Sequence, residues 1–406
     1  MITIQVPEAA KRIIEQLNTN GFEAYVVGGC VRDSLLGRTP EDWDITTSAK
    51  PEQVKEIFKR TVDTGIQHGT VTVLIDHEGY EVTTYRVDGE YEDGRHPKSV
   101  EFTGSLLEDL KRRDFTINAM AYSDREGLVD AFDGVKDLEG QTIRCVGNAV
   151  DRFTEDALRI LRAIRFSAQL GFDLEEETRE AIAVIAPNMA KVSKERIQVE
   201  LTKLLLSDNP GKLKCVYENG IGPYISDHFE HAGRRLLEAE KLAWLPLKKH
   251  LRWSGFLRLE EPQDAVRILK ELKLDNETIH QTKTLVSLWK TEIPADKAAI
   301  RQVMSGLSPE LFQDLLCFQK VFCPETYKAQ LNMVEQYSGE ILSAGDCIRL
   351  KDMAVTGREL MDAGMKPGPE MGAVLDHLFQ LVLTQPECNN REYLMKSAEH
   401  LLKEQA

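Results

Sequence analysis

The spacing of hydrophobic residues divides the chain into a first third of mixed character and a longer remainder. In the first third, stretches with apolar residues three and four positions apart are interrupted by short runs that are continuously or alternately apolar. Such a mixture predicts short helices and strands in turn. Beyond about Arg144 nearly every segment has the helical spacing, with capping residues between segments. The pattern predicts an α+β head followed by an all-α remainder.

The elements expected in the first third are short. The chain opens with a short strand and an amphipathic helix. We expect helices at residues 8–20, 31–36 and 51–58 and strands at residues 24–27 and 43–48. Two alternating segments then form a hairpin around the turn His77-Glu78-Gly79. Together these strands predict a small mixed or antiparallel sheet with helices packed against it.

Length and composition limit the class of protein. A chain of 406 residues is too long for one ordinary core, so we expect two to four domains. It is 42% hydrophobic and 29% charged, with no apolar run long enough for a membrane span and no export signal. The seven cysteines are scattered without a CxxC pair, which argues against disulfides and structural zinc. We expect a cytoplasmic protein.

The net charge of −15 argues against a broad nucleic-acid-binding surface. Residues 231–258 are locally basic, however, and include Trp244, Trp253 and Phe256. This segment fits either contacts to RNA phosphates or core aromatic residues beside solvated lysines and arginines. The charge therefore does not exclude RNA as a partner.

The main candidate for catalysis is a pair of aspartates, Asp42 and Asp44. On a strand they would project from the same side, about 7 Å apart, where they could share divalent cations. Two carboxylates so placed suit nucleotidyl transfer with two Mg²⁺ ions. A DxD pair on its own is more often a solvated turn. The preceding Gly28, Gly29 and Arg32 favour the catalytic reading, because glycine N–H groups and an arginine can hold a phosphate.

Three further segments could complete such a site. Glu81, on the second hairpin strand, could add a third carboxylate, or could be an exposed charge. The polar loop at residues 86–102 could close over a substrate through Asp88, Arg95 and His96. Arg113 could face a triphosphate while the neighbouring Asp114 caps a helix, although an ordinary helix start explains the segment equally well.

The helix expected from Thr154 carries Asp156 and Arg159, which could recognise a base. The pairing edges of cytosine and adenine both present an amino donor next to an acceptor nitrogen, which an aspartate beside an arginine complements. Uracil and guanine reverse the pattern, and each mispaired buried group costs roughly 1–3 kcal/mol. The pair could therefore accept CTP and ATP and reject UTP and GTP. The alternative is a surface ion pair at i,i+3.

Four segments in this order and spacing, GGCVRD, DWDI, RRDFTINA and EDALRILRAIRF, resemble the head and neck motifs of class II tRNA nucleotidyltransferases, the CCA-adding enzymes. Bacterial poly(A) polymerases are close relatives of this family. A weaker similarity continues through residues 192–205 and 355–372. The length and the lack of an HD-type metal domain resemble the short enzymes of Gram-positive bacteria.

The resemblance implies an elongated molecule of four parts. These are a nucleotidyltransferase head (residues 1–145), a neck that recognises the base (146–210), a helical body (211–305) and a helical tail that binds tRNA (306–406). It implies two Mg²⁺ ions as cofactors and CTP, ATP and tRNA as partners. A homodimer is left open.

The resemblance also assigns roles to residues. It places catalytic magnesium on Asp42 and Asp44, the nucleotide on Gly29, Arg32 and Arg113, and base recognition on Asp156 with Arg159. Arg162 and Arg165 match nucleotide-binding arginines of the family, although helical geometry points Arg165 away from Asp156. The loop at residues 86–102 resembles the family's flexible element. Lys366, in a tail loop, could meet a tRNA phosphate or belong to an interhelical turn.

The expected activity is addition of C, C and A to the 3′ end of tRNA, in which the 3′-hydroxyl attacks the α-phosphate and pyrophosphate leaves. A poly(A) polymerase would share every head motif and is the nearest alternative. A noncatalytic RNA-binding protein is disfavoured by the retained DxD pair. A metal-dependent phosphohydrolase is disfavoured because Asp227-His228 has no companion histidines.

Overall fold

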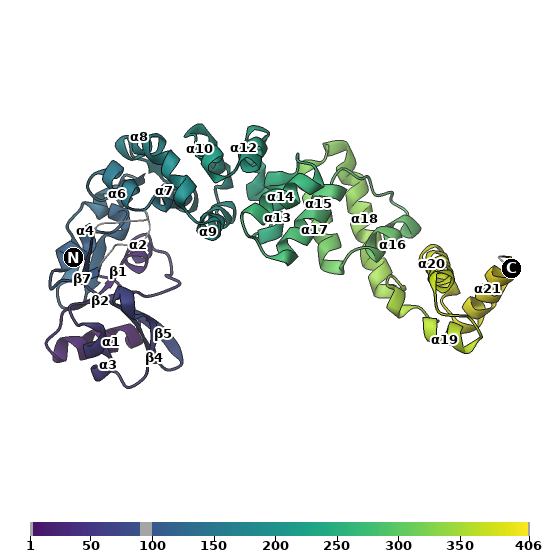
Figure 1. Ribbon diagram of the computed structural model, residues 1–406, viewed down its shortest axis with the longest axis horizontal. Helices are drawn as coiled ribbons and strands as arrows, with labels where there is room; N and C mark the ends of the chain where they lie inside the picture. The colour runs from purple at the N-terminus through teal and green to yellow at the C-terminus, as the bar shows by residue number, and fades with distance from the viewer. Residues whose placement is uncertain (1–2, 90–99, 405–406) are drawn as a thin grey trace. The chain divides into compact units, whose positions relative to one another are not determined.

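The computed structural model describes residues 3–89 and 100–404, and the chain divides into two compact units. Unit 1 contains Met1–Ala243 together with Arg267–Leu274, and unit 2 contains Trp244–Val266 together with Asp275–Ala406. Figure 1 shows strands only among the purple and blue segments of unit 1, and helices in the green and yellow segments. The predicted order of an α+β head and a helical remainder is confirmed. The finer division into four parts stays a prediction.

A mixed sheet of seven strands forms the head, in the order β3-β4-β5-β2-β1-β8-β9. The contact between β2 and β5 is parallel, and every other neighbouring pair in this sheet is antiparallel. The small mixed sheet is therefore confirmed. Its strands are β1 (Ala24–Val27), β2 (Ile45–Thr47), β3 (Thr61–Gly65), β4 (Thr70–Ile75), β5 (Glu78–Thr84), β8 (Met120–Ser123) and β9 (Gly127–Asp130).

Short helices cover this sheet. The amphipathic helix α1 (Glu8–Thr19) buries Ala10, Ile13 and Leu17, and it packs with α3 (Pro51–Ile57) near the central strands. Helix α2 (Gly29–Leu35) follows β1 directly and packs on β1 and β8 (Figure 1). The remaining helices of the head are α4 (Leu106–Lys111), α5 (Gly134–Glu139), η1 (Ile66–His68) and η2 (Thr116–Asn118).

Three local predictions for the head were wrong. Residues 3–7 form no strand, although Ile4 and Val6 are buried. The hairpin turn lies at Asp76 and His77, which have φ values of 51° and 71°, because positive φ at both central residues suits a tight two-residue turn. Strand β2 begins at Ile45, so both site aspartates precede it.

The predicted helix from Thr154 is interrupted. Helix α6 (Ala149–Glu155) ends before Asp156, which is extended at φ −145° and ψ 102°, and α7 (Leu158–Leu170) then begins. Thr154 is therefore in the last turn of α6, where its hydroxyl donates to the carbonyl of Val150. The helical remainder also contains the short strand β11 (Asp173–Leu174), which pairs in parallel with β10 (Thr142–Ile143) at the end of the head. Strands β6 (Arg86–Asp88) and β7 (Val100–Phe102) form another two-stranded sheet.

The other helices of unit 1 follow β11 in sequence. They are α8 (Glu176–Ile185), η3 (Ala186–Lys191), α9 (Lys194–Leu205), η4 (Pro210–Leu213), α10 (Lys214–Glu218), α11 (Gly222–Ile225), α12 (Asp227–Arg234) and η5 (Ala239–Trp244). Helix α7 packs along α9, and this contact brings charged side chains of both helices together.

Unit 2 is helical throughout its described residues. Its cores are apolar: Trp253 and Phe256 are buried, as the core interpretation of residues 231–258 predicts, whereas Trp244 is 66% exposed. Helix α14 (Pro262–Glu271) has residues in both units. The other helices are α13 (Lys249–Leu257), α15 (Asn276–Leu288), α16 (Lys297–Ser305), α17 (Pro309–Phe322), α18 (Glu325–Ala344), η6 (Leu350–Asp352), α19 (Gly357–Asp362), α20 (Pro369–Thr384), η7 (Pro386–Cys388) and α21 (Arg391–Glu404).

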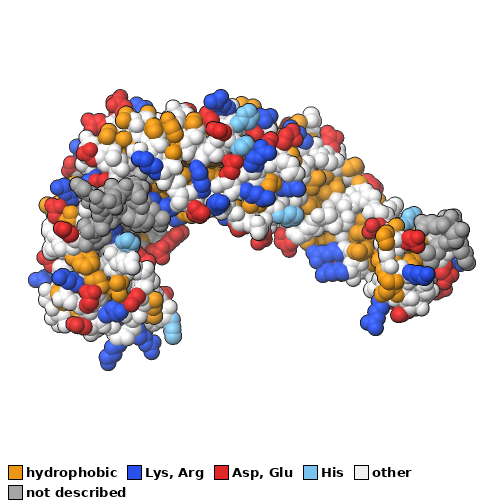
Figure 2. Space-filling view, in the orientation of Figure 1, with side chains coloured by type: hydrophobic (Ala, Val, Ile, Leu, Met, Phe, Trp, Pro, Cys, Tyr) orange, Lys and Arg blue, Asp and Glu red, His pale blue; other side chains and the backbone are white. Residues whose placement is uncertain are grey.

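Two expectations from composition can be compared with the structure. All seven cysteines are free, as expected from their scattered positions. On the face that Figure 2 shows, Lys and Arg side chains are interspersed with Asp and Glu, so the negative net charge is not gathered into one acidic surface there. In the described part of the chain, no helix combines the length and the hydropathy that a bilayer span requires.

Candidate functional site

Three carboxylates lie where β2 and β5 run side by side. Asp42 and Asp44 are in the extended segment before β2, and the carbonyl of Asp44 accepts a hydrogen bond from the Val27 amide at 3.0 Å. The parallel register pairs Ile45 with Val82, which makes Asp44 and Glu81 neighbours across the two strands. The adjacency on which the prediction for Glu81 depends is therefore present.

The charges of these carboxylates affect one another. The pKa of Asp44 is raised by loss of solvation first and by the negative charge of Glu81 second; Arg113 opposes the rise, and Asp42 adds to it. Repulsion of this kind is relieved when a divalent cation binds between carboxylates. The group is electrostatically suited to a cation.

The number of carboxylates fits magnesium better than zinc or calcium. Within residues 3–89 and 100–404, no three His, Cys, Asp or Glu side chains are arranged as a complete metal site. Magnesium usually takes one or two protein carboxylates and fills its other positions with water and substrate phosphates. Asp42 and Asp44 therefore fit Mg²⁺ that binds together with a phosphate-bearing substrate.

Asp42 and Asp44 line a cavity of about 570 Å³. Its walls come from α2, from the segment before β2, from α7 and from the end of α9. Polar and charged residues predominate, among them Arg32, Asp42, Asp44, Arg165, Gln169, Lys203 and Asp208. The cavity thus joins an acidic pair to basic side chains, as a site for a metal-bound polyphosphate requires.

Gly28 holds the turn that brings Arg113 to this site. Its φ of 82° is in the left-handed region, and a Cβ atom there would lie 2.9 Å from Nη1 of Arg113. Only glycine avoids both the backbone strain and this collision. Arg113 also lies 3.4 Å from Asp109, while its buried Nε has no hydrogen-bond partner in the structure. Arg113 therefore has capacity for an anionic ligand.

Arg32 is held rigidly at the wall of the cavity. Its Nε and Nη2 donate to the carboxylate of Asp33 at 2.9 and 2.8 Å, and its Nη1 donates to Oδ1 of Asn118 at 2.7 Å. Arg32 and Arg165 stack on the ring of Phe166, at 5.1 and 3.7 Å from its centre. Phe166, a cavity residue that sequence reasoning missed, fixes the positions of two predicted arginines.

A buried polar network extends from Arg32 into α7. Asn118 donates to Oδ1 of Asp114 at 3.2 Å, and Asp114 accepts from Nε of Arg162 at 2.8 Å. Arg165 donates to Glu200 of α9 at 2.6 Å. The pKa of Asp114 is lowered to about 2, since Arg162 and Arg159 outweigh the opposing effect of its burial. Asn118 and Glu200 are the other residues missed; their RRDFTINA and VELTKLL segments contained the signal.

The alternative reading of Asp156, an i,i+3 ion pair on one continuous helix, differs from the partner that the structure gives it. Asp156 binds Arg196 of α9 at 2.7 Å and accepts the amide of Leu158 at 3.1 Å. Arg159 is only 9% exposed, and it donates to Glu155 at 2.6 Å and to the carbonyl of Arg112 at 3.2 Å. The break at Asp156 explains the difference, because it ends the regular 100° rotation between positions.

The cavity also changes the expectation for Arg165. Helical geometry made it the arginine with least support, yet Arg165 lines the cavity with Asp42 and Asp44. Among the described residues, the lining includes neither Asp156 nor Arg159. The two residues predicted to recognise the base therefore lie outside the cavity that the acidic pair lines.

The remaining predicted residues are placed as follows. Asp88 ends strand β6, whereas Arg95 and His96 lie outside the described residues. Lys366 is exposed in the loop before α20, whose Pro369 starts the helix. Both an interhelical turn and a contact to an outside ligand are compatible with this position.

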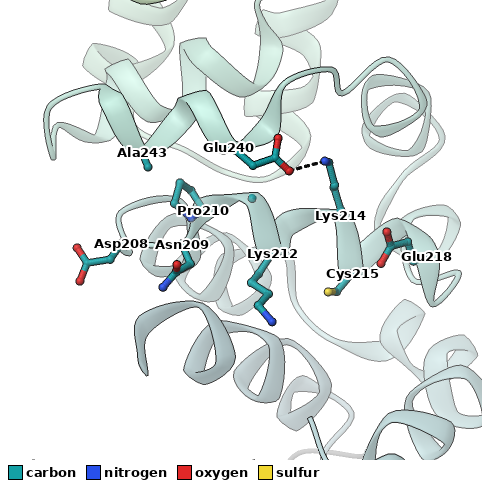
Figure 3. Close-up of a pocket in the computed structure, with 10 residues that line it drawn as sticks. Asp208, Asn209, Pro210, Lys212, Lys214, Cys215, Glu218, Glu240 and Ala243 are labelled. Atoms are coloured by element: carbon teal, nitrogen blue, oxygen red, sulfur yellow. Dashed lines mark hydrogen bonds and ion pairs between the residues drawn. The ribbon is translucent and has the colours of Figure 1, made fainter. Parts of the chain in front are cut away.

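A second pocket, of about 450 Å³, contains none of the predicted residues (Figure 3). It lies between η4, the start of α10 and η5, and Asp208 lines both this pocket and the first cavity. Lys214 crosses it to bind Glu240 at 2.6 Å, the dashed contact in Figure 3. Its lysines are therefore engaged in ion pairs within the protein.

The fold and the site together define the class of protein. The model of the poly A polymerase head domain matches residues 24–144, which include the sheet and all three carboxylates. A model of the RNA- and SrmB-binding site of polymerase A matches residues 171–225, and the model of tRNA nucleotidyltransferase domain 2 matches residues 247–398. The chain thus has a nucleotidyltransferase head followed by helical regions typical of RNA-processing polymerases.

Similarity over the whole length identifies the family. The chain is 41% identical to the CCA-adding enzyme of Latilactobacillus sakei, over 98% of this chain and 99% of that one. It is 37% identical to the CCA-adding enzyme of Enterococcus faecalis, over 96% and 95%. A crystal structure of the Bacillus stearothermophilus CCA-adding enzyme in complex with CTP matches with a TM-score of 0.84 and 32% identity, over 97% and 98%. The chain belongs to the CCA-adding enzymes.

Proposed function

We propose that this protein adds C, C and A, in that order, to the 3′ end of tRNA, using CTP and ATP and releasing pyrophosphate. The observation that supports this most directly is the cavity in which Asp42 and Asp44 face Arg32 and Arg165. The relatives that match the whole chain are CCA-adding enzymes. The similarity to a poly A polymerase model concerns the head, which both kinds of enzyme share.

Asp42 and Asp44 are the residues that would hold Mg²⁺. When bound, magnesium would favour deprotonation of the attacking 3′-hydroxyl and neutralise charge on the triphosphate. Glu81 lies beside Asp44 and raises its pKa, so it strengthens the negative potential at the pair. We assign Glu81 this supporting role.

The triphosphate would lie against the basic side of the cavity. The turn at Gly28 and Gly29 lets Arg113 approach, and among the described residues the buried Nε of Arg113 has no hydrogen-bond partner. Arg32 and Arg165 are pre-oriented by Asp33, Glu200 and the ring of Phe166. Side chains held in place before binding lose little conformational entropy when a phosphate arrives.

Base choice is assigned to Asp156 and Arg159, with Arg162 supporting them through Asp114. An aspartate acceptor beside an arginine donor matches the pairing edges of cytosine and adenine and mismatches those of uracil and guanine. Because both side chains are held by ion pairs to half-buried partners, a mismatched base cannot reorient them cheaply.

Incorporation of single nucleotides tests this function. Purified protein is incubated with Mg²⁺, tRNA lacking its CCA end and one labelled triphosphate at a time, and the products are separated by length. We expect addition of two C residues from CTP, and of one A from ATP only after both C residues are present. Long A tails with CTP ignored would instead indicate a poly(A) polymerase. UTP incorporated as readily as CTP would contradict the proposed base recognition.

Several finer assignments remain predictions. They are the two-ion magnesium content, tRNA binding by Lys366 and the tail, closure of the loop through Asp88, Arg95 and His96, cytoplasmic location and a homodimer. Removal of divalent cations by EDTA, followed by titration with Mg²⁺, tests the first of them. Activity that persists in EDTA would exclude metal-dependent transfer.

A further inference from the structure

At the break between α6 and α7, the carboxylate of Asp156 binds a residue of a different helix, α9. Its Oδ2 accepts a hydrogen bond from Nη2 of Arg196 at 2.7 Å, and its Oδ1 accepts one from Nη1 of Arg196 at 3.3 Å. Oδ1 also accepts the backbone amide of Leu158 at 3.1 Å. The side chains of Asp156 and Arg196 are 15% and 23% exposed, so this contact is mostly shielded from water.

The number of acceptor positions on Asp156 is informative. An ionised carboxylate offers about four lone-pair positions. The three contacts of the structure occupy three of them, which leaves one position, on Oδ2. Cytosine N4 and adenine N6 each present one N–H on the pairing edge. The one acceptor position that remains on Oδ2 therefore matches the single N–H that cytosine or adenine presents.

We propose that Arg196 is a positioning residue for base choice, acting through Asp156; this inference rests on the proposed role of Asp156 as a reader of the base. The two hydrogen bonds from the guanidinium group fix the rotation of the carboxylate. An ionised carboxylate cannot donate, so it repels the carbonyl oxygens of uracil O4 and guanine O6.

Without Arg196, only the amide of Leu158 still holds the carboxylate, through Oδ1, so Oδ2 can turn away from the base. The penalty for a carbonyl facing it then decreases, because the mispaired groups no longer have to remain in contact. Arg159 is held separately, by Glu155 and by the carbonyls of Arg152 and Arg112, and remains in place. Discrimination is lost while chemistry at Asp42 and Asp44 continues.

The test compares discrimination in full-length variants. For each protein, kcat/KM is measured for CTP and for UTP on tRNA lacking CCA, and for ATP and GTP on tRNA ending in CC. We expect Arg196→Gln to lower both preferences about tenfold, as loss of about 1.4 kcal/mol implies. Arg196→Lys should lie between parent and Arg196→Gln, since lysine keeps the charge without the paired geometry.

Two further variants separate this inference from the proposed function. Arg179→Gln removes an arginine from an exposed ion pair with Glu176, and it should leave the preferences unchanged. Asp156→Ala should lose discrimination whatever the role of Arg196. Unchanged preferences in Arg196→Gln, with discrimination lost in Asp156→Ala, would overturn the inference and leave the reader intact. Unchanged preferences in Asp156→Ala would overturn both.

A purely structural role for Arg196 gives a different result. It would reduce CTP and UTP incorporation by the same factor, lower the midpoint of thermal unfolding and leave the ratio at the parent value. That outcome would also overturn the inference. If Arg196→Gln does not fold, the ratio measured for Arg196→Lys decides, because the lysine keeps a charge beside Asp156. A parent protein that adds neither C nor A would refute the proposed function itself.

Discussion

Ion pairs between buried arginines and carboxylates have different roles in the two units. In unit 1, Arg32 and Arg165 pair with Asp33 and Glu200 and still line the cavity beside Asp42 and Asp44. In unit 2, Arg301 of α16 binds Asp346 at 2.7 Å and donates to the carbonyl of Leu383 at 3.0 Å. The first set presents charge to a cavity, whereas the second joins helix α16 to neighbouring segments.

A buried ion pair by itself therefore does not indicate function. Both kinds pay a desolvation cost that their hydrogen bonds offset, and both are destabilised when one partner is removed. What distinguishes unit 1 is that its charged groups converge on one ring, Phe166, at the wall of a cavity. Substitutions in unit 1 should therefore change catalysis, and substitutions in unit 2 should change mainly stability.

The largest effect is expected at the acidic pair. Asp42→Ala or Asp44→Ala should lower nucleotide incorporation about 10³-fold or more, the scale seen when a group that stabilises transition-state charge is lost. Affinity for tRNA, measured by filter binding, should be nearly unchanged. Asp63→Ala, at an exposed aspartate of β3, is the control and should keep parental activity. Parental activity in either site variant would refute the assignment of the metal.

In unit 2, Arg301→Ala should reduce stability and spare catalysis. It leaves Asp346 and the Leu383 carbonyl without their partner, so we expect a loss of about 3 kcal/mol in the free energy of unfolding. Urea unfolding measures this loss, and CTP incorporation is assayed well below the transition. Lys297→Ala removes an exposed pair from the same helix and should change little. Loss of activity without a change in stability would contradict the structural role that we expect for the ion pairs of unit 2.

The network of unit 1 should show a dependence on pH. The pKa of Asp114 is about 2 in the folded chain and about 3.9 in an unfolded one, so its stabilising effect is complete above about pH 4 and is lost as the pH falls toward 2. This effect is on the order of 2 kcal/mol. Asp114→Asn should flatten the fall in unfolding free energy between pH 4 and pH 2. Equal pH slopes for the two proteins would contradict the assignment.

Substitution of Arg159 should change the choice of base more than the rate of turnover. Arg159→Ala removes the donor that we propose complements the acceptor nitrogen of cytosine and adenine. We expect the preference for CTP over UTP to fall about tenfold, with activity on CTP retained. The ratio of kcat/KM values on tRNA lacking CCA measures this. A ratio equal to that of the parent would show that Arg159 does not read the base.

The smallest effect is expected at Lys366. Its exposed side chain would contribute one phosphate contact, so Lys366→Ala should weaken tRNA binding severalfold and reduce the salt dependence by about one unit of slope. Lys283→Ala, at an exposed position of α15, should leave the slope unchanged. Unchanged binding in Lys366→Ala would favour the simple interhelical turn.

Local patterns in the sequence were sufficient for most of the secondary structure. The buried strand β1 and helix α3 appear within a residue of the expected bounds, because apolar periodicity and Pro51 at a helix start are local signals. The break at Asp156 was missed. Its residues all suit a helix, and the ion pair to Arg196, forty positions away, helps to hold the extended backbone that separates α6 from α7.

The residues of the candidate site also fall into those that local patterns predict and those that depend on contacts between distant segments. Local spacing was sufficient to predict the aspartate pair, the double glycine and the arginines of α7 as candidate site residues, since this spacing reflects bonds along the chain. Only the tertiary structure decided that Glu81 lies beside Asp44, that Phe166 gathers the arginines, and that Asp156 binds Arg196 instead of Arg159. These contacts join distant segments, and they depend on strand register and helix packing that no local spacing encodes.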